Sequence, residues 1–188
     1  MPSRADAPLA GIEVIDLVAG PMAAIGRTLA ELGAAVTRAE PPGGAWDRPR
    51  PDQGDPAAGL DFAALNAGKK SVTLNLKNEA DLAAAKELVA RSDVMVENFR
   101  PGVIGRLGLG YESLKAENPG LIYCSISGFG AESPHRDRPA FDIVAQALSG
   151  VMSVNREPGQ PPNKLGLPLG DMAGSIFSVF GILAALHE

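Results

Sequence analysis

The chain has 188 residues, 45% of them hydrophobic and 21% charged, and carries a formal net charge of −5. These values are typical of one soluble globular domain with a sizeable core, and the negative charge argues against a nucleic-acid partner. Cys124 is the only cysteine, which excludes an internal disulfide and a multi-cysteine metal site. Because Cys124 lies in an apolar run, we interpret it as a buried structural thiol in a reducing cytoplasm. We therefore expect a cytoplasmic protein without a metal.

The first forty residues predict a β-α-β unit. Alternating apolar residues indicate a strand over 11–18, which Gly20-Pro21 interrupts. Apolar residues at helical spacing predict a helix over 22–32 that Gly33 ends, and a second short strand follows over 35–39. Such a unit implies a parallel pair of strands with a right-handed crossover.

A nicotinamide cofactor is not expected. Glu40 lies about as far downstream as the acid of the dinucleotide-binding fingerprint. However, the turn over 19–22 lacks the G-x-G-x-x-G motif that this fingerprint requires.

Strands and helices continue to alternate after this unit. The stretch 41–60, rich in Pro, Gly and Asp, predicts a long loop that carries Arg48 and Arg50. Further strands are predicted over 71–76, 93–97 and 121–126, and helices over 79–90 with Asn78 as its cap, 111–117 and 140–148. The alternation predicts an α/β fold, an open parallel sheet with helices on both faces, in one domain over residues 1–188.

Basic residues occur in the turns expected at the carboxyl ends of the strands, where open α/β sheets bind ligands. Arg38 and Arg100 lie in two of these turns, and Lys69, Lys70 and Arg106 are expected close by. Two interpretations remain open. The cations form a site for a phosphate-bearing ligand, with arginine as the bidentate group, or they are scattered solvated charges.

Asp171 is the only ionisable residue between Lys164 and His187. It follows Gly170 and precedes an apolar helix with small residues in its first turn. Two compatible interpretations remain open: Asp171 is the N-cap of this helix, or it is a nucleophile that the helix N-terminus keeps ionised. The helix is apolar but too short and too interrupted by Gly and Ser to predict a membrane span.

Five segments, taken in order, resemble one family. They are Val18-Ala19-Gly20-Pro21, Arg38-Ala39-Glu40-Pro41-Pro42-Gly43-Gly44, Asn66-Ala67-Gly68-Lys69-Lys70-Ser71, Glu97-Asn98-Phe99-Arg100-Pro101-Gly102 and Leu169-Gly170-Asp171. The ordered set resembles the family III CoA-transferases, from about Leu9 to the last residue. The resemblance implies the Rossmann-like large domain of that fold and an intertwined homodimer. Members of the family continue into a small domain and a C-terminal return, so we expect this chain to be an incomplete large domain that needs a second chain for activity.

By this resemblance the protein is an enzyme that moves CoA between an acyl-CoA thioester and a carboxylic acid. Asp171 is then the nucleophile that forms a mixed anhydride and an aspartyl-CoA thioester, while backbone N–H groups of the helix start stabilise the oxyanions. Coenzyme A enters as the acyl-CoA substrate. The family's CoA path maps onto Val18, Arg38, Leu74, Asn98, Phe99 and Arg106, and an acyl site onto Phe141, Asp142 and Gly170.

Two alternatives to a transferase remain. The family's α-methylacyl-CoA racemases use a His–Asp pair as acid and base, but the place of that histidine holds Phe141, which carries no proton. The other alternative is a non-catalytic CoA-binding subunit in which Asp171 is only a cap. Formyl-CoA transferases have Gln where this chain has Val18, which argues against formyl-CoA and oxalate as substrates.

Overall fold

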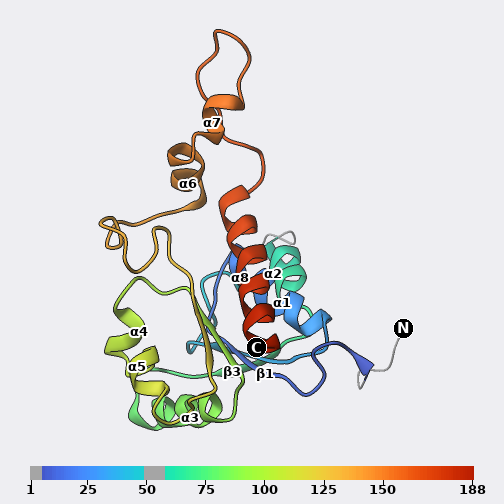
Figure 1. Cartoon of the computed structure of the whole chain (residues 1–188), viewed down its shortest axis with the longest axis vertical. Coiled ribbons are helices and arrows are strands. Elements are labelled where there is room, and N and C mark those ends of the chain that lie inside the picture. Colours follow the sequence, from blue (N-terminus) through green and yellow to red (C-terminus); the bar gives the residue numbers. More distant parts are fainter. Residues whose placement is uncertain (1–5, 49–57) are drawn as a thin grey trace.

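The computed structural model describes residues 6–48 and 58–188. Its centre is one sheet of five parallel strands in the order β3-β2-β1-β4-β5 (Figure 1). The strands are β1 Glu13–Asp16, β2 Ala35–Glu40, β3 Lys70–Thr73, β4 Val94–Glu97 and β5 Ile122–Ser125. The predicted open parallel sheet is confirmed, with strand ends that differ from the predicted ones by a few residues. The chain places β2 and β3 on one side of β1 and β4 and β5 on the other, so the strand order reverses between β1 and β4. Open α/β sheets bind ligands at such a point.

Helices connect and cover the strands. They are the 3-10 turn η2 Pro21–Ala23, α1 Ala24–Glu31, α2 Ala58–Asn66, α3 Glu79–Ala90, α4 Val103–Arg106, α5 Tyr111–Leu114, α6 Asp142–Leu148, α7 Val151–Val154 and α8 Leu169–His187. The bounds predicted for α3 are confirmed, and the Asn78 side chain accepts hydrogen bonds from the backbone nitrogens of Ala80 and Asp81, as a cap should.

Each face of the sheet has its own core. In β1, Val14 packs in a cluster with residues of α1 and α8, whereas the next residue, Ile15, packs in a cluster with residues of α3, α4 and α5. Side chains alternate between the two faces of a strand, so two apolar neighbours in β1 serve two helical layers. Helices on both faces are therefore confirmed.

Some predicted boundaries are wrong. The predicted loop over 41–60 ends earlier, because α2 begins at Ala58, and Arg50 lies outside the described residues. The 111–117 helix ends at Leu114, and the 140–148 helix begins at Asp142, because Phe141 is still extended. Neither α2 nor the single turn α7 was predicted.

Figure 1 shows α6, α7 and the loop after them as an arm that projects from the sheet, and α8 running back from this arm along α1. By length and composition α8 could cross a membrane, and 17% of its most apolar window is buried. A single helix of this kind is weak evidence for a membrane span, because core helices of soluble proteins pass the same test. Its packing against α1, η2, α6 and β5 places its first turn beside the arm.

Candidate functional site

Asp171 is the third residue of α8, and the residue in the N-cap position is Pro168. Interpreting Asp171 as the N-cap is therefore wrong, since its side chain belongs to the first helical turn. A carboxylate in that turn still interacts favourably with the positive end of the helix dipole. The side chain is half-buried.

The cap of α8 comes from another helix. Asp142, the first residue of α6, accepts hydrogen bonds through Oδ1 from the backbone nitrogens of Gly170 at 2.7 Å and Asp171 at 3.3 Å. These two N–H groups are among those that the sequence analysis assigned to oxyanions, and in this structure they are already satisfied. A Cβ on Gly170 would lie 3.0 Å from Ala145 Cβ, so α6 approaches this turn closely enough to favour glycine.

The environment of Asp171 disfavours its charged form. Burial raises the pKa of the Asp171 carboxyl, and the nearby negative charge of Asp142 raises it further. The carboxylate of Asp171 is therefore more basic than that of a solvated aspartate.

A cavity of about 410 Å³ lies at the carboxyl ends of β1, β2 and β4. The structure brings together five of the six residues predicted to lie along a CoA path, which all line this cavity: Val18, Arg38, Leu74, Asn98 and Phe99. The sixth, Arg106, is exposed on α4 and does not line it, although the next residue, Leu107, does. Sequence reasoning missed Lys77, an exposed cation at this cavity, although its position directly after the strand predicted over 71–76 was a signal that could have identified it.

Arg38 is buried and its charge is neutralised within the chain. Its Nη2 donates to Asp47 Oδ1 at 2.6 Å, and its Nη1 donates to Asn66 Oδ1. Its Nε finds no hydrogen-bond acceptor among the residues that the structure describes, and Glu40 lies 3.9 Å from it. Arg38 is thus a buried ion-pair partner at the cavity wall rather than an exposed cation.

The amine of Lys69 is also bound by acceptors inside the protein. Its Nζ donates to Asp16 Oδ2 at 2.7 Å, to the carbonyl of Ala23 at 2.7 Å and to Asn66 Oδ1 at 2.9 Å. Burial lowers the pKa of this amine, while Asp16 opposes that shift.

The cations predicted to cluster are therefore divided. Arg38 and Lys69 are buried, whereas Lys70, Arg100 and Arg106 are exposed, and only Arg38 lines the 410 Å³ cavity.

Side chains from the strand ends fix the turns around this cavity. Buried Asp16 accepts from the backbone nitrogen of Val18 at 2.9 Å, and buried Glu97 accepts from that of Phe99 at 2.8 Å. Asn98 accepts from the nitrogen of Ala19 and donates to its carbonyl, at 3.2 Å and 3.0 Å. The turns after β1 and β4 are thus tied to each other.

The segment 41–48 crosses the ends of β1 and β2. Arg48 binds Glu40 with two hydrogen bonds of 2.8 Å and 2.6 Å, and Asp47 Oδ2 accepts from the backbone nitrogen of Gly20 at 2.8 Å. Gly20 has a φ of 80°, which favours glycine, and a Cβ there would lie 2.6 Å from the Trp46 ring, so that ring would also have to move. Glu40 therefore anchors this segment, in agreement with the absence of a dinucleotide fingerprint.

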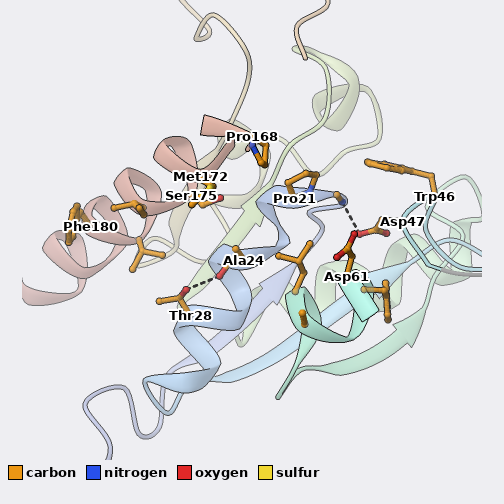
Figure 2. A pocket seen from close by; sticks show the side chains of 16 residues that line it. Pro21, Ala24, Thr28, Trp46, Asp47, Asp61, Pro168, Met172, Ser175 and Phe180 are labelled. Atoms are coloured by element: carbon orange, nitrogen blue, oxygen red, sulfur yellow. Dashed lines mark hydrogen bonds between the residues drawn. The ribbon is translucent and has the colours of Figure 1, made fainter. Parts of the chain in front are cut away.

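A second cavity, of about 870 Å³, is lined largely by apolar side chains of η2, α1, α2 and α8. Figure 2 shows Met172, Ser175 and Phe180 of α8 on one side of it and Asp61 of α2 on the other. Trp46 lines both cavities and is 74% exposed. Asp171 is not among the lining residues, but Pro168 and Met172 on either side of it are.

The remaining predicted acyl-site residues lie on α6 and its N-cap. Phe141 is 78% exposed on the arm, whereas Asp142 is directed to the start of α8 and accepts from Gly170. Within residues 6–48 and 58–188, no group of three or more His, Cys, Asp or Glu residues is arranged to hold a metal ion.

Comparison with known proteins gives a consistent result. A family profile described as CoA-transferase family III matches residues 9–188. The acetyl-CoA:oxalate CoA-transferase of Acetobacter aceti is 43% identical over 99% of this chain and 48% of that protein. The succinyl-CoA:mesaconate CoA-transferase of Haloarcula marismortui is 41% identical over 94% of this chain and 46% of that protein. The crystal structure of a CAIB/BAIF family protein from Brucella suis superposes with a TM-score of 0.87 at 39% identity, over 96% of this chain and 49% of that one. The chain thus spans about half the length of the relatives it matches.

Proposed function

The chain belongs to CoA-transferase family III, and on this basis we propose that the protein moves CoA between an acyl-CoA thioester and a carboxylic acid. The observation that carries the proposal is the half-buried carboxylate of Asp171 in the first turn of α8, with a raised pKa. No other ionisable side chain lies near it in sequence, and its carboxylate is basic enough to act as a nucleophile.

The proposed reaction proceeds through covalent intermediates on Asp171. Its carboxylate attacks the thioester carbonyl, the C–S bond breaks, and a mixed anhydride and the CoA thiolate form. The thiolate attacks the Asp171 carbonyl, which releases the first carboxylic acid as its carboxylate and leaves an aspartyl-CoA thioester. The acceptor carboxylate attacks this thioester, and the released thiolate then attacks the acyl carbonyl of the new anhydride. The product acyl-CoA leaves and the Asp171 carboxylate is restored.

We assign the CoA path to the 410 Å³ cavity and its rim. The half-buried Phe99 offers apolar surface to the cofactor, Val18 and Leu74 are buried apolar residues of the cavity wall, and Asn98 fixes the turn beside Phe99. Arg106 and Lys77 are exposed cations suited to phosphate groups. Arg38 belongs to the buried wall of the cavity, where its charge is paired with that of Asp47.

A racemase-type His–Asp pair fits this chain poorly. His187 is at the other end of α8, sixteen residues from Asp171, which corresponds to about 24 Å along a helix. The ring of His135 packs edge-on against Phe129, 5.8 Å between centroids, and Phe141 stands in the place of the racemase histidine. The alternative of a non-catalytic CoA-binding subunit assumed that Asp171 is only a cap, but the residue that caps α8 is Asp142.

The assembly is part of the proposal. Apolar residues of α8 such as Ile176, Phe177 and Phe180 are exposed, and the chain spans about half of its relatives. We therefore propose that a second chain, in a homodimer or in a complex, packs on this face of α8 and completes the site in the cytoplasm. We assign no acyl group. The Acetobacter relative is named for oxalate, whereas Val18 argues against oxalate as a substrate, and that expectation remains a prediction.

Native mass spectrometry of the purified protein with a panel of acyl-CoAs tests the proposed function. We expect an acyl or CoA adduct that maps to Asp171 and is released by hydroxylamine. The Asp171→Asn variant should bind CoA without an adduct, whereas Glu79→Gln, which removes an acid from the first turn of α3, should keep the adduct. An adduct that persists in Asp171→Asn would overturn the assignment.

A further inference from the structure

The chain that leads into α8 is held by a buried glutamine of α6. Gln146 Oε1 accepts a hydrogen bond from the backbone nitrogen of Leu165 at 2.8 Å, and its Nε2 donates to the carbonyl of Leu167 at 3.1 Å. Only 2% of Gln146 is exposed. A buried amide that binds backbone on two sides fixes the path of residues 165–167, which have no helix or strand of their own.

The same glutamine orients the carboxylate that caps α8. Gln146 Nε2 also donates to Asp142 Oδ2 at 2.5 Å, which leaves Oδ1 of Asp142 to accept from Gly170 and Asp171. Asp142 and Gln146 are four residues apart on α6 and therefore lie on one face of that helix. Together they connect α6 by hydrogen bonds to the backbone of Leu165, Leu167, Gly170 and Asp171.

We propose that Asp142 and Gln146 are positioning residues for Asp171, which fix the first turn of α8 and place a second carboxylate beside the reacting one. Their effect on transfer rests on the proposed function, whereas their effect on the Asp171 carboxyl does not. Because the cap is supplied by α6 on the arm, the geometry of Asp171 depends on how the arm packs against α8.

The charged groups around this turn are few. Of the elements packed against α8, α6 brings Asp142, and η2 brings no ionisable side chain. On α1, Arg27 and Glu31 form an ion pair with each other. On β5, Cys124 forms a hydrogen bond with Ser178 of α8, and burial raises the pKa of the Cys124 thiol. Asp142 is therefore the charge that most directly affects Asp171, in agreement with its contribution to the raised pKa of that carboxyl.

Two substitutions at one position separate the cap from the charge. Asparagine keeps one oxygen that can accept from the amides of Gly170 and Asp171, although its Nδ2 cannot accept from Gln146 Nε2 as Oδ2 of Asp142 does. Asp142→Asn should therefore remove the charge and leave both amides better protected from hydrogen exchange than Asp142→Ala does. Asp142→Ala should expose both amides. In NMR titrations of protein labelled with 13C-aspartate, Asp142→Asn should lower the pH at which Asp171 titrates, because the neighbouring negative charge is removed. The Asp171 signal is assigned with Asp171→Asn.

The controls decide between positioning and general stability. Asn78→Ala removes a side-chain cap of the same kind from α3, and it should lower the melting temperature without changing the titration of Asp171. Gln146→Ala should increase exchange over residues 165–171. The proposal is overturned if Asp142→Ala leaves both amides protected, or if Asp142→Asn leaves the titration of Asp171 unchanged. Neither readout requires an acyl-CoA, so a protein that forms no adduct would contradict the proposed function alone.

Discussion

The guanidinium of Arg38 donates a hydrogen bond to Asp47 across 2.6 Å, with 2% of the first side chain and 10% of the second exposed. Asp47 uses its other oxygen to accept from the backbone nitrogen of Gly20. One carboxylate thus ties the end of β2 to the turn after β1 and holds the segment 41–48 across both cavities. The cavity that we assign to CoA is therefore shaped by an internal ion pair.

We expect Asp47→Ala to destabilise the protein by about 3 kcal/mol, because it removes the closer of the two carboxylates beside the buried charge of Arg38 and leaves only Glu40, 3.9 Å from Nε. Urea unfolding of both proteins measures this difference. Arg27→Ala, which breaks the exposed pair of Arg27 with Glu31, is the control and should cost less than about 1 kcal/mol. Equal costs for the two substitutions would contradict the burial argument.

The pH dependence of stability should carry the signature of Glu40. The Arg48 guanidinium holds the pKa of this carboxyl at about 2, well below the ordinary 4.5, and Ser71 adds to the effect. As pH falls from 4.5 toward 2, the unfolded chain binds more protons than the folded one, so the stabilisation is lost over that window. We expect the free-energy difference between wild type and Glu40→Gln to be largest above pH 4.5 and to shrink below it.

Urea unfolding at a series of pH values checks this expectation. Glu31→Gln, at an exposed position, should show a small difference from wild type throughout. A difference between wild type and Glu40→Gln that does not change below pH 4.5 would mean that the Arg48 pair does not stabilise the fold.

Glu97 should behave in the opposite way. Burial raises the pKa of this carboxyl above 4.5, although Ser125 and the backbone nitrogen of Phe99 act against the shift. Above pH 4.5 the folded protein holds this proton more tightly than the unfolded chain, so stability falls as pH rises through the raised pKa. Glu97→Gln keeps an oxygen for Phe99 and has no charge to bury.

The Glu97→Gln variant should therefore match wild type below pH 4.5 and exceed it in stability at neutral pH. Thermal unfolding at acidic and neutral pH measures the two differences. A variant that is less stable than wild type at neutral pH would indicate that the charged form of Glu97 is required.

The features predicted correctly from the sequence depend on residues close to one another in the chain. The bounds of α3 follow from Asn78 and the apolar spacing after it, and the β-α-β unit follows from Pro21, Gly33 and two short apolar runs. The helix α2 was missed because its apolar residues do not fall on one face. Local pattern therefore predicted the sheet, its helical layers and the segments that border the first cavity.

The chemistry of the site depends on pairs that no local pattern reveals. Asp142 caps α8 from 28 residues away, and Lys69 pairs with Asp16 from 53 residues away. From the sequence, Lys69 is therefore a candidate for anion binding and Asp171 a candidate cap. Buried ion pairs, and a helix cap supplied by another helix, depend on tertiary packing, because each needs two elements that meet only in the folded chain.

The last prediction compares two glycines of α8. A Cβ on Gly170 would lie 3.0 Å from Ala145 Cβ and 3.2 Å from Asp142 Oδ1, whereas a Cβ on Gly181 would meet nothing within 4 Å. Alanine is the better helix former, so Gly181→Ala should stabilise the protein by about 0.5–1 kcal/mol. Gly170→Ala should not stabilise the protein in this way, because α6 must move away from α8, which also weakens the Asp142 cap. Thermal unfolding of both variants, with hydrogen exchange at the Asp171 amide, measures the contrast. An equal gain in stability from the two substitutions would show that α6 does not pack against the first turn of α8 as described.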